Sequence, residues 1–235
     1  MTNERVTNIP AVYQDVKELL GNDMSGHGMD HVDRVLKLAT EFAENEGADR
    51  EIITLAALLH DVDDYKIFGE EHAEKLLNAN NILDKYNVSV STRNKVLNII
   101  HSMGYSKYIE GVRPDTLEGM IVSDADMCDA IGAIGILRTH AYALSKGDVF
   151  FDKNLHPQDG PTSTSGYKAA KKSHSVQHFF DKLLKIPSLL MTYAGKAEGK
   201  KREAIMIQFL REIFTEECAD EWLAYLDAFE KANGR

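Results

Sequence analysis

Apolar residues recur at steps of three and four along most of this chain, which is the periodicity of an amphipathic helix. The clearest run follows His31 and consists of Val32, Val35, Leu36, Leu38, Ala39, Phe42 and Ala43. No segment gives a sustained alternation of apolar and polar residues bounded by turn signals, which is the pattern of a half-buried strand. The sequence therefore predicts an all-α fold.

The helix with the most apolar centre is expected in the middle of this bundle. Asp49 is its expected N-cap, and the helix runs from Arg50 to about Asp61 through the segment LAALLH. Further helices are expected at about 10–21, 69–79, 91–103, 114–127, 129–146, 174–186, 188–214 and 216–232. A polar stretch at 148–174 holds two of the five prolines, and we expect it to be a long functional or mobile loop.

Composition excludes several classes of protein. The formal net charge of −10 argues against binding a nucleic-acid polymer, although a locally basic pocket for a small anion is allowed. Two cysteines are too few for a disulfide scaffold and fit a reducing compartment, with a single bridge between them as the alternative. No window approaches the ~20 consecutive apolar residues of a bilayer span, and the N-terminus lacks signal-peptide character. We expect a cytoplasmic protein with no membrane partner, and the sequence leaves its oligomeric state unknown.

Three segments concentrate groups that bind metal ions. His60 and Asp61 directly follow the apolar run 55–59, and by themselves they are most simply a polar helix end. The upstream segment SGHGMDHVDRV adds His27 and His31, and the downstream segment IVSDADMCDAIGAIGI adds Asp124, Asp126 and Asp129. Acids in so apolar a segment repel one another unless a cation compensates them. Imidazoles combined with carboxylates favour a first-row metal ion over Ca²⁺.

The order His31, His60-Asp61, Asp126 resembles the H…HD…D signature of the HD-domain superfamily of metal-dependent phosphohydrolases, which are all-helical. The segments GHGMDHVDRV, LAALLHDVDDYK, DADMCDAIGAIGILR and HSVQHFFDKLLKI together resemble its stand-alone YedJ/YpgQ-like branch over roughly residues 20–215. This resemblance implies one helical HD-type domain over residues 1–235. Its parts would be an HD core at about 25–130, the polar loop at about 148–174 and additional C-terminal helices at about 174–232.

The resemblance also implies the ligands of the metal ion, which are His31, His60, Asp61 and Asp126. Two imidazoles and two carboxylates leave coordination positions open for water and a phosphate oxygen, as a catalytic site requires. The doubled histidines of binuclear HD relatives are missing, so we expect one divalent ion. Mn²⁺ is favoured, with Fe²⁺, Co²⁺, Zn²⁺ and Mg²⁺ as alternatives.

Several nearby residues are candidates for supporting roles. Asp64 lies at the position of a general acid or base proposed for many HD hydrolases, and would share a face with Asp61 if the helix continued; its alternative is a solvent-facing acid. Asp63 is expected to be structural or exposed. Arg34 and Lys66 are candidate phosphate binders, although Arg34 could instead pair with a neighbouring acid.

Other candidates lie further along the chain. His101 is expected to contact a phosphate or support the metal ligands, and His27 to support them or cap a turn. By the resemblance, Lys182 in the HFxxKL pattern and the preceding loop lie over the active site. The polar side chains of that loop are either a locally positive lid or the solvated start of a helix; they are Lys168, Lys171, Lys172 and His174. The sequence departs from the usual Asp-Arg-Leu in Asp126-Met127-Cys128, which removes an arginine beside the site.

Taken together, these features imply a metal-dependent phosphohydrolase that acts on a small phosphorylated substrate. The resemblance favours a nucleotide, in a nucleoside triphosphate pyrophosphohydrolase reaction where metal-bound hydroxide attacks phosphorus. A phosphomonoesterase acting on nucleotides, and a nucleotide-binding or signalling module without turnover, are the alternatives. Asp64, Lys66 and Arg34 favour an enzyme, because sensing alone does not require an acid that transfers protons.

Overall fold

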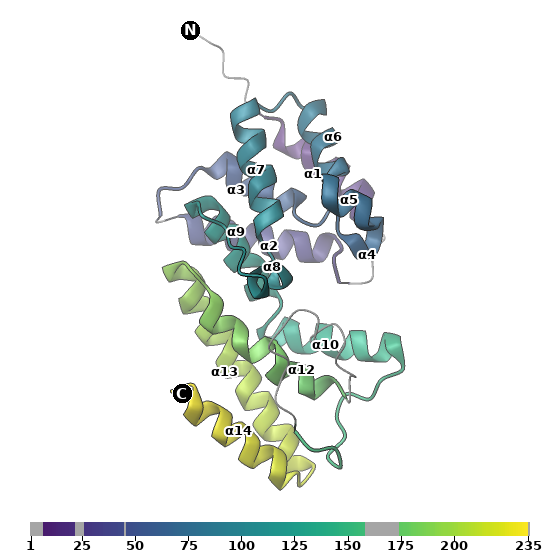
Figure 1. Ribbon diagram of the computed structural model, residues 1–235, viewed down its shortest axis with the longest axis vertical. Coiled ribbons are helices and arrows are strands. Elements are labelled where there is room, and N and C mark those ends of the chain that lie inside the picture. Colours follow the sequence, from purple (N-terminus) through teal and green to yellow (C-terminus); the bar gives the residue numbers. More distant parts are fainter. Residues whose placement is uncertain (1–6, 22–25, 45, 158–173, 235) are drawn as a thin grey trace. The chain divides into compact units, whose positions relative to one another are not determined.

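A computed structural model describes residues 7–21, 26–44, 46–157 and 174–234 (Figure 1). Every regular element among these residues is a helix, which confirms the all-α prediction. The chain divides into two compact units, Met1–Asp126 and Met127–Arg235, here called the N-terminal unit and the C-terminal unit. None of the helices in the described part is long and apolar enough to cross a bilayer.

The N-terminal unit is a bundle in which α3 is the central helix. Its helices are α1 (Ile9–Leu20), α2 (Met29–Ala43), α3 (Arg50–Leu59), α4 (Tyr65–Phe68), α5 (Glu70–Lys75), α6 (Leu77–Lys85), α7 (Val90–Ser102), α8 (Tyr105–Ile109) and α9 (Leu117–Asp129), of which α9 continues into the C-terminal unit. Helix α3 packs against α1, α2 and α7. Its position places the residues that follow Leu59 at the end of a buried helix.

The local sequence explains why α3 forms and is buried. The Asp49 carboxylate accepts the backbone N–H groups of Glu51 and Ile52 at 3.0 and 3.3 Å, and so caps the N-terminus. All residues from Leu55 to Leu59 have an exposed fraction of 0%. Burying each large apolar side chain contributes about 1.5–3 kcal/mol, so this helix is a major source of stability in the unit.

The single helix expected at 69–79 is divided into α5 and α6, because Leu76 adopts a left-handed conformation with φ 48°. The buried carboxylate of Asp63 caps the second piece, accepting the backbone N–H groups of Asn78 and Ala79, each at 2.9 Å. A cap supplied from 15 residues upstream stabilises a new helix start that local periodicity does not reveal. Asp63 is therefore structural, as expected.

The C-terminal unit is built around one long helix and an aromatic core. Its elements are α10 (Gly132–Lys146), α12 (Ser175–Asp181), the 3-10 helix η1 (Leu183–Leu189), α13 (Tyr193–Glu216) and α14 (Asp220–Ala232). Helix α13 packs against α10, η1 and α14. The side chains of Phe179, Phe214 and Trp222 are fully buried, and the Trp222 indole N–H donates to the carbonyl of Leu155 at 2.8 Å. This hydrogen bond satisfies the one polar atom of the indole ring.

The long loop predicted at 148–174 is described only in part. Residues 148–157 contain no helix, and the carbonyls of Val149 and Phe150 accept the backbone N–H groups of Ser175 and Val176 at 3.3 and 3.0 Å. These bonds hold the start of α12 against the first part of the loop. Three candidate side chains of the predicted lid, Lys168, Lys171 and Lys172, lie outside the described residues.

Candidate metal centre

Two buried histidines from different helices meet in the N-terminal unit. His31 lies in the first turn of α2, and His60 directly follows α3. Each side chain is 3% exposed, and their Nε2 atoms are 3.1 Å apart. The Nδ1–H of His60 donates to the carbonyl of Ala57 at 2.9 Å, which leaves the lone pair of its Nε2 directed at the cluster.

Two carboxylates complete this cluster. Oδ2 of Asp61 lies 3.4 Å from Nε2 of His31 and 3.5 Å from Nε2 of His60. Oδ1 of Asp126 lies 3.4 and 3.9 Å from the same two nitrogens. Two ligand atoms that share an ion at ~2.1 Å are about 3.0 Å apart at a right angle and about 3.4 Å apart at the tetrahedral angle. The two nitrogens are 3.1 Å apart, and each carboxylate oxygen lies 3.4–3.9 Å from them. The ligand atoms of His31, His60 and Asp126 are thus close enough together to hold one divalent metal ion.

The histidines keep both carboxylates ionised. Burial raises the pKa of Asp61, but the electrostatic interaction with His60 and hydrogen bonds from His27 and His31 outweigh this effect and hold the pKa of Asp61 well below the usual range. Burial likewise raises the pKa of Asp126, and its contacts with His31 and His60 more than offset that effect and lower it. The cluster is thus prepared for a cation, since metal ions bind carboxylates in their deprotonated form.

The three acidic residues of this segment, Asp124, Asp126 and Asp129, lie in different environments. Asp126 contacts the histidines, and Asp124 is fully buried within α9. Asp129 lies in the C-terminal unit, where its buried carboxylate accepts from Nη1 of Arg138 at 3.1 Å. An arginine from α10 therefore pairs with an acid of this segment, although the arginine usual after Asp126 is missing.

Asp64 comes close to Asp61 through a turn and not along a continued helix. Helix α3 ends at Leu59, residues 60–63 form turns, and the backbone N–H of Asp64 donates to the carbonyl of Asp61 at 3.1 Å. Ligand atoms of His27, Asp61 and Asp64 lie within 4.8 Å of one another. Asp64 is also the N-cap of α4, because its Oδ1 accepts the backbone N–H of Lys66 at 2.9 Å.

The two candidate phosphate binders have protein partners. Nη1 of Arg34 lies 2.9 Å from Oδ2 of Asp30 one turn earlier in α2, which is the neighbouring-acid alternative. The ammonium group of Lys66 lies 3.2 Å from Nε2 of His27. A role of either residue in binding phosphate remains a prediction.

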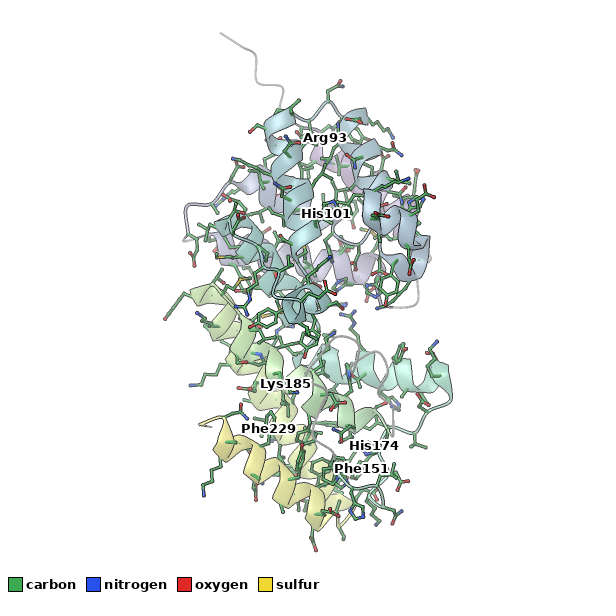
Figure 2. All side chains as sticks on the ribbon, viewed as in Figure 1. Arg93, His101, Phe151, His174, Lys185 and Phe229 are labelled. Atoms are coloured by element: carbon green, nitrogen blue, oxygen red, sulfur yellow. The ribbon has the colours of Figure 1, made fainter. Side chains whose placement is uncertain are left out.

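His101 and Lys182 lie on different units. His101 is exposed on α7 (Figure 2). With Tyr65 and Lys107, it lines a depression of about 520 Å³. Sequence reasoning did not find Tyr65 or Lys107, because the short helices α4 and α8 that carry them give no periodic signal. Lys182 follows the last residue of α12 in the C-terminal unit, and its predicted role over the active site is a proposal.

His174 is the N-cap residue of α12, but its side chain is buried and not solvated. It is 3% exposed, and its ring centroid lies 4.9 Å from that of Trp222 and 5.5 Å from that of Phe151 (Figure 2). Neither ring nitrogen has a hydrogen-bond partner among the described residues. Burial lowers the pKa of His174 to about 4. Polar neighbours in the sequence suggested a surface position, but the aromatic rings place this side chain in the core.

The order of His31, His60, Asp61 and Asp126 along the chain agrees with the family whose model matches this sequence. The HD domain family matches residues 28–131, a range that contains His31, His60, Asp61 and Asp126. The chain belongs to the HD-domain family.

Individual relatives share most of their length with this chain. The protein YpgQ of Bacillus subtilis (strain 168) is 30% identical over 202 residues, which cover 84% of this chain and 88% of YpgQ. The structure of an HD-superfamily hydrolase from Bacillus thuringiensis is similar with a TM-score of 0.70 and 36% identity, over 90% of this chain and 97% of that one. The structure of YpgQ in complex with ADP gives a TM-score of 0.64 and 26% identity, over 89% and 97%.

Proposed function

We propose that this protein is a metal-dependent nucleoside triphosphate pyrophosphohydrolase that uses one divalent ion, with Mn²⁺ favoured. The observation that carries the proposal is the convergence of four side chains: the two imidazole Nε2 atoms are 3.1 Å apart, and one oxygen of each carboxylate lies 3.4–3.9 Å from them. Membership of a family that includes a hydrolase supports an enzyme, and the ADP complex of the relative YpgQ supports a nucleotide substrate.

The proposed ligands are His31, His60, Asp61 and Asp126. The bound ion would supply an acidified water molecule and would neutralise charge on the phosphoryl oxygens. The protein's own contribution is to orient these ligands: the carbonyl of Ala57 fixes the ring of His60, and both imidazole side chains are only 3% exposed.

Asp64 is the proposed acceptor of the proton that the attacking water loses. Its carboxylate lies within 4.8 Å of Asp61 without being required as a ligand, and its capping bond to the backbone of Lys66 fixes its orientation. The positive side chains of Arg34, Lys66 and Lys182, together with His101, are proposed to bind the phosphates of the substrate. Their charge would stabilise the transition state as negative charge builds on the phosphoryl oxygens.

The test is product analysis with a panel of nucleoside triphosphates, diphosphates and monophosphates in the presence of Mn²⁺. We expect each hydrolysed triphosphate to give a nucleoside monophosphate and pyrophosphate. Release of inorganic phosphate from monophosphates would instead establish a phosphomonoesterase. Nucleotide binding without any product would establish a binding module.

The variant Asp64→Asn tests the proposed proton acceptor. Asparagine keeps the size and the capping bond but cannot accept the proton, so we expect kcat to fall by about 10²–10⁴-fold with metal content retained. Asp49→Asn is the matched control, because Asp49 also caps a helix through a backbone N–H two residues later, at the opposite end of α3. A fully active Asp64→Asn protein would remove Asp64 from the mechanism.

A further inference from the structure

Three side chains from separate segments form a continuous chain of contacts that ends at the candidate metal centre. The ammonium group of Lys66, on α4, lies 3.2 Å from Nε2 of His27. Nδ1 of His27, which precedes α2, lies 2.8 Å from Oδ2 of Asp61. The side chains of His27 and Asp61 are 17% and 13% exposed, so water competes little for the second contact.

The chemistry of the donors fixes the direction of both hydrogen bonds. A lysine ammonium group can only donate, so Nε2 of His27 must accept and must carry its lone pair. The ring proton of a neutral imidazole then resides on Nδ1, which donates to the Asp61 carboxylate. Lys66 therefore selects the tautomer of His27 that is able to hold Asp61.

We propose that His27 is a positioning residue for Asp61 and that Lys66 sets its tautomer. The proposal rests on the proposed role of Asp61 as a metal ligand. The oxygen that accepts from His27 is the same Oδ2 that lies 3.4 and 3.5 Å from the nitrogens of His31 and His60. Holding that atom fixes the carboxylate rotamer before the ion arrives, which lowers the entropic cost of forming the site.

The contact between Lys66 and His27 also bears on the number of metal ions that the chain binds. His27, Asp61 and Asp64 are close enough to form a second group of potential ligands. The ammonium group of Lys66 already lies at His27 and supplies the positive charge that this group attracts. The geometry therefore points to one metal ion per chain, with Lys66 as the fixed cation beside it.

The experiment measures Mn²⁺ affinity and stoichiometry by calorimetry, without substrate, on the full chain. His27→Ala is expected to weaken Mn²⁺ binding by about 10–100-fold, the usual effect of losing a group that orients a ligand. His27→Asn is expected to restore much of the affinity, because its amide N–H replaces the Nδ1 donor. Lys66→Arg, which is also a donor only and keeps the positive charge, is expected to preserve both the affinity and the stoichiometry of one ion per chain.

His72→Ala is the matched control for the histidine variants. His72 also contacts an aspartate, with its Nδ1 3.1 Å from Oδ1 of Asp63, but that carboxylate is held in addition by two backbone N–H groups. We expect the affinity of this variant for Mn²⁺ to match that of the wild type.

Each outcome decides a separate point. Absence of Mn²⁺ binding by the wild type would overturn the proposed metal centre. Normal binding by both the wild type and His27→Ala would leave that centre intact and overturn the positioning role. Two ions per wild-type chain, or a proton on Nε2 of His27 in ¹H–¹⁵N spectra of the Zn²⁺-loaded protein, would overturn the assignment of Lys66.

Discussion

At the scale of single residues, Asp126 provides the most direct test of the metal centre. Its side chain is 25% exposed and contacts two imidazoles. Asp126→Ala is expected to abolish bound metal and hydrolysis while helical content stays near the wild-type value, since truncation of this partly exposed side chain leaves no large cavity. Elemental analysis and circular dichroism measure the two effects.

Asp129→Asn is the contrasting variant at this scale. Asp129 pairs with Arg138, so we expect a lower melting temperature with metal content unchanged. Metal retained in Asp126→Ala and lost in Asp129→Asn would instead make Asp129 the ligand.

The sequence predicted the positions of the four proposed ligands better than the contacts of the residues around them. His31 and His60 lie at helix ends that local apolar periodicity identifies, and a family signature orders them along the chain. The contact between Lys66 and His27 joins residues 39 positions apart and depends on the turn that follows α3. The course of such a turn cannot be predicted from residue spacing or composition. The contact between Lys66 and His27 is therefore visible only in the structure.

At the scale of elements, the start of α10 tolerates no side chain at Gly135. A Cβ added there would lie 2.4 Å from the backbone oxygen of Ala130, and a backbone atom cannot rotate away as a side chain can. We expect Gly135→Ala to destabilise the protein by about 1–3 kcal/mol through this overlap. The midpoint of urea unfolding measures the change.

Gly147→Ala is the control for this glycine. Gly147 ends the same helix with φ +68° and no atom within 4 Å of the added Cβ, so its substitution costs only backbone strain of about 1 kcal/mol. A smaller loss in Gly135→Ala than in Gly147→Ala would contradict the proposed overlap.

Long helices with continuous periodicity were predictable, whereas short ones were not. The predicted helices at 10–21 and 91–103 correspond to α1 and α7 within one residue at each end. Helices α4 and α8 have four and five residues, too few for periodicity to be recognised. Asp64 caps the start of α4, and glycines with positive φ lie at the end of α4 and at the start of α8, Gly69 and Gly104 respectively.

At the scale of the whole molecule, His174 makes stability depend on pH. Its folded-state pKa of about 4 lies below the usual 6.5, so the unfolded chain binds the proton more readily between these values. The contribution of His174 to the free energy of unfolding is therefore fully present above pH 6.5. It is lost as the pH decreases toward 4, and the loss is at most on the order of 3 kcal/mol. Melting temperatures across this interval should fall less in His174→Phe than in the wild type, whereas exposed His156→Ala should resemble the wild type.

Metal binding should also stabilise the molecule. An ion that binds only the folded state contributes RT ln(1 + [L]/Kd), or about 2.7 kcal/mol at a hundredfold excess over Kd. We expect EDTA to lower the melting temperature and Mn²⁺ to restore it, and Asp126→Ala to respond to neither. Identical melting curves of the wild type in chelator and in Mn²⁺ would show that the cluster does not bind the ion.

The position of Trp222 makes its fluorescence a probe of the C-terminal unit. It is the single tryptophan of the chain and is fully buried in the C-terminal unit, whereas the four proposed ligands all lie in the N-terminal unit. Intrinsic fluorescence therefore follows the unfolding of one unit, while metal ions act on the other. A chelator that shifts the fluorescence midpoint would reveal that the two units unfold together, and an unchanged midpoint would reveal that they unfold independently.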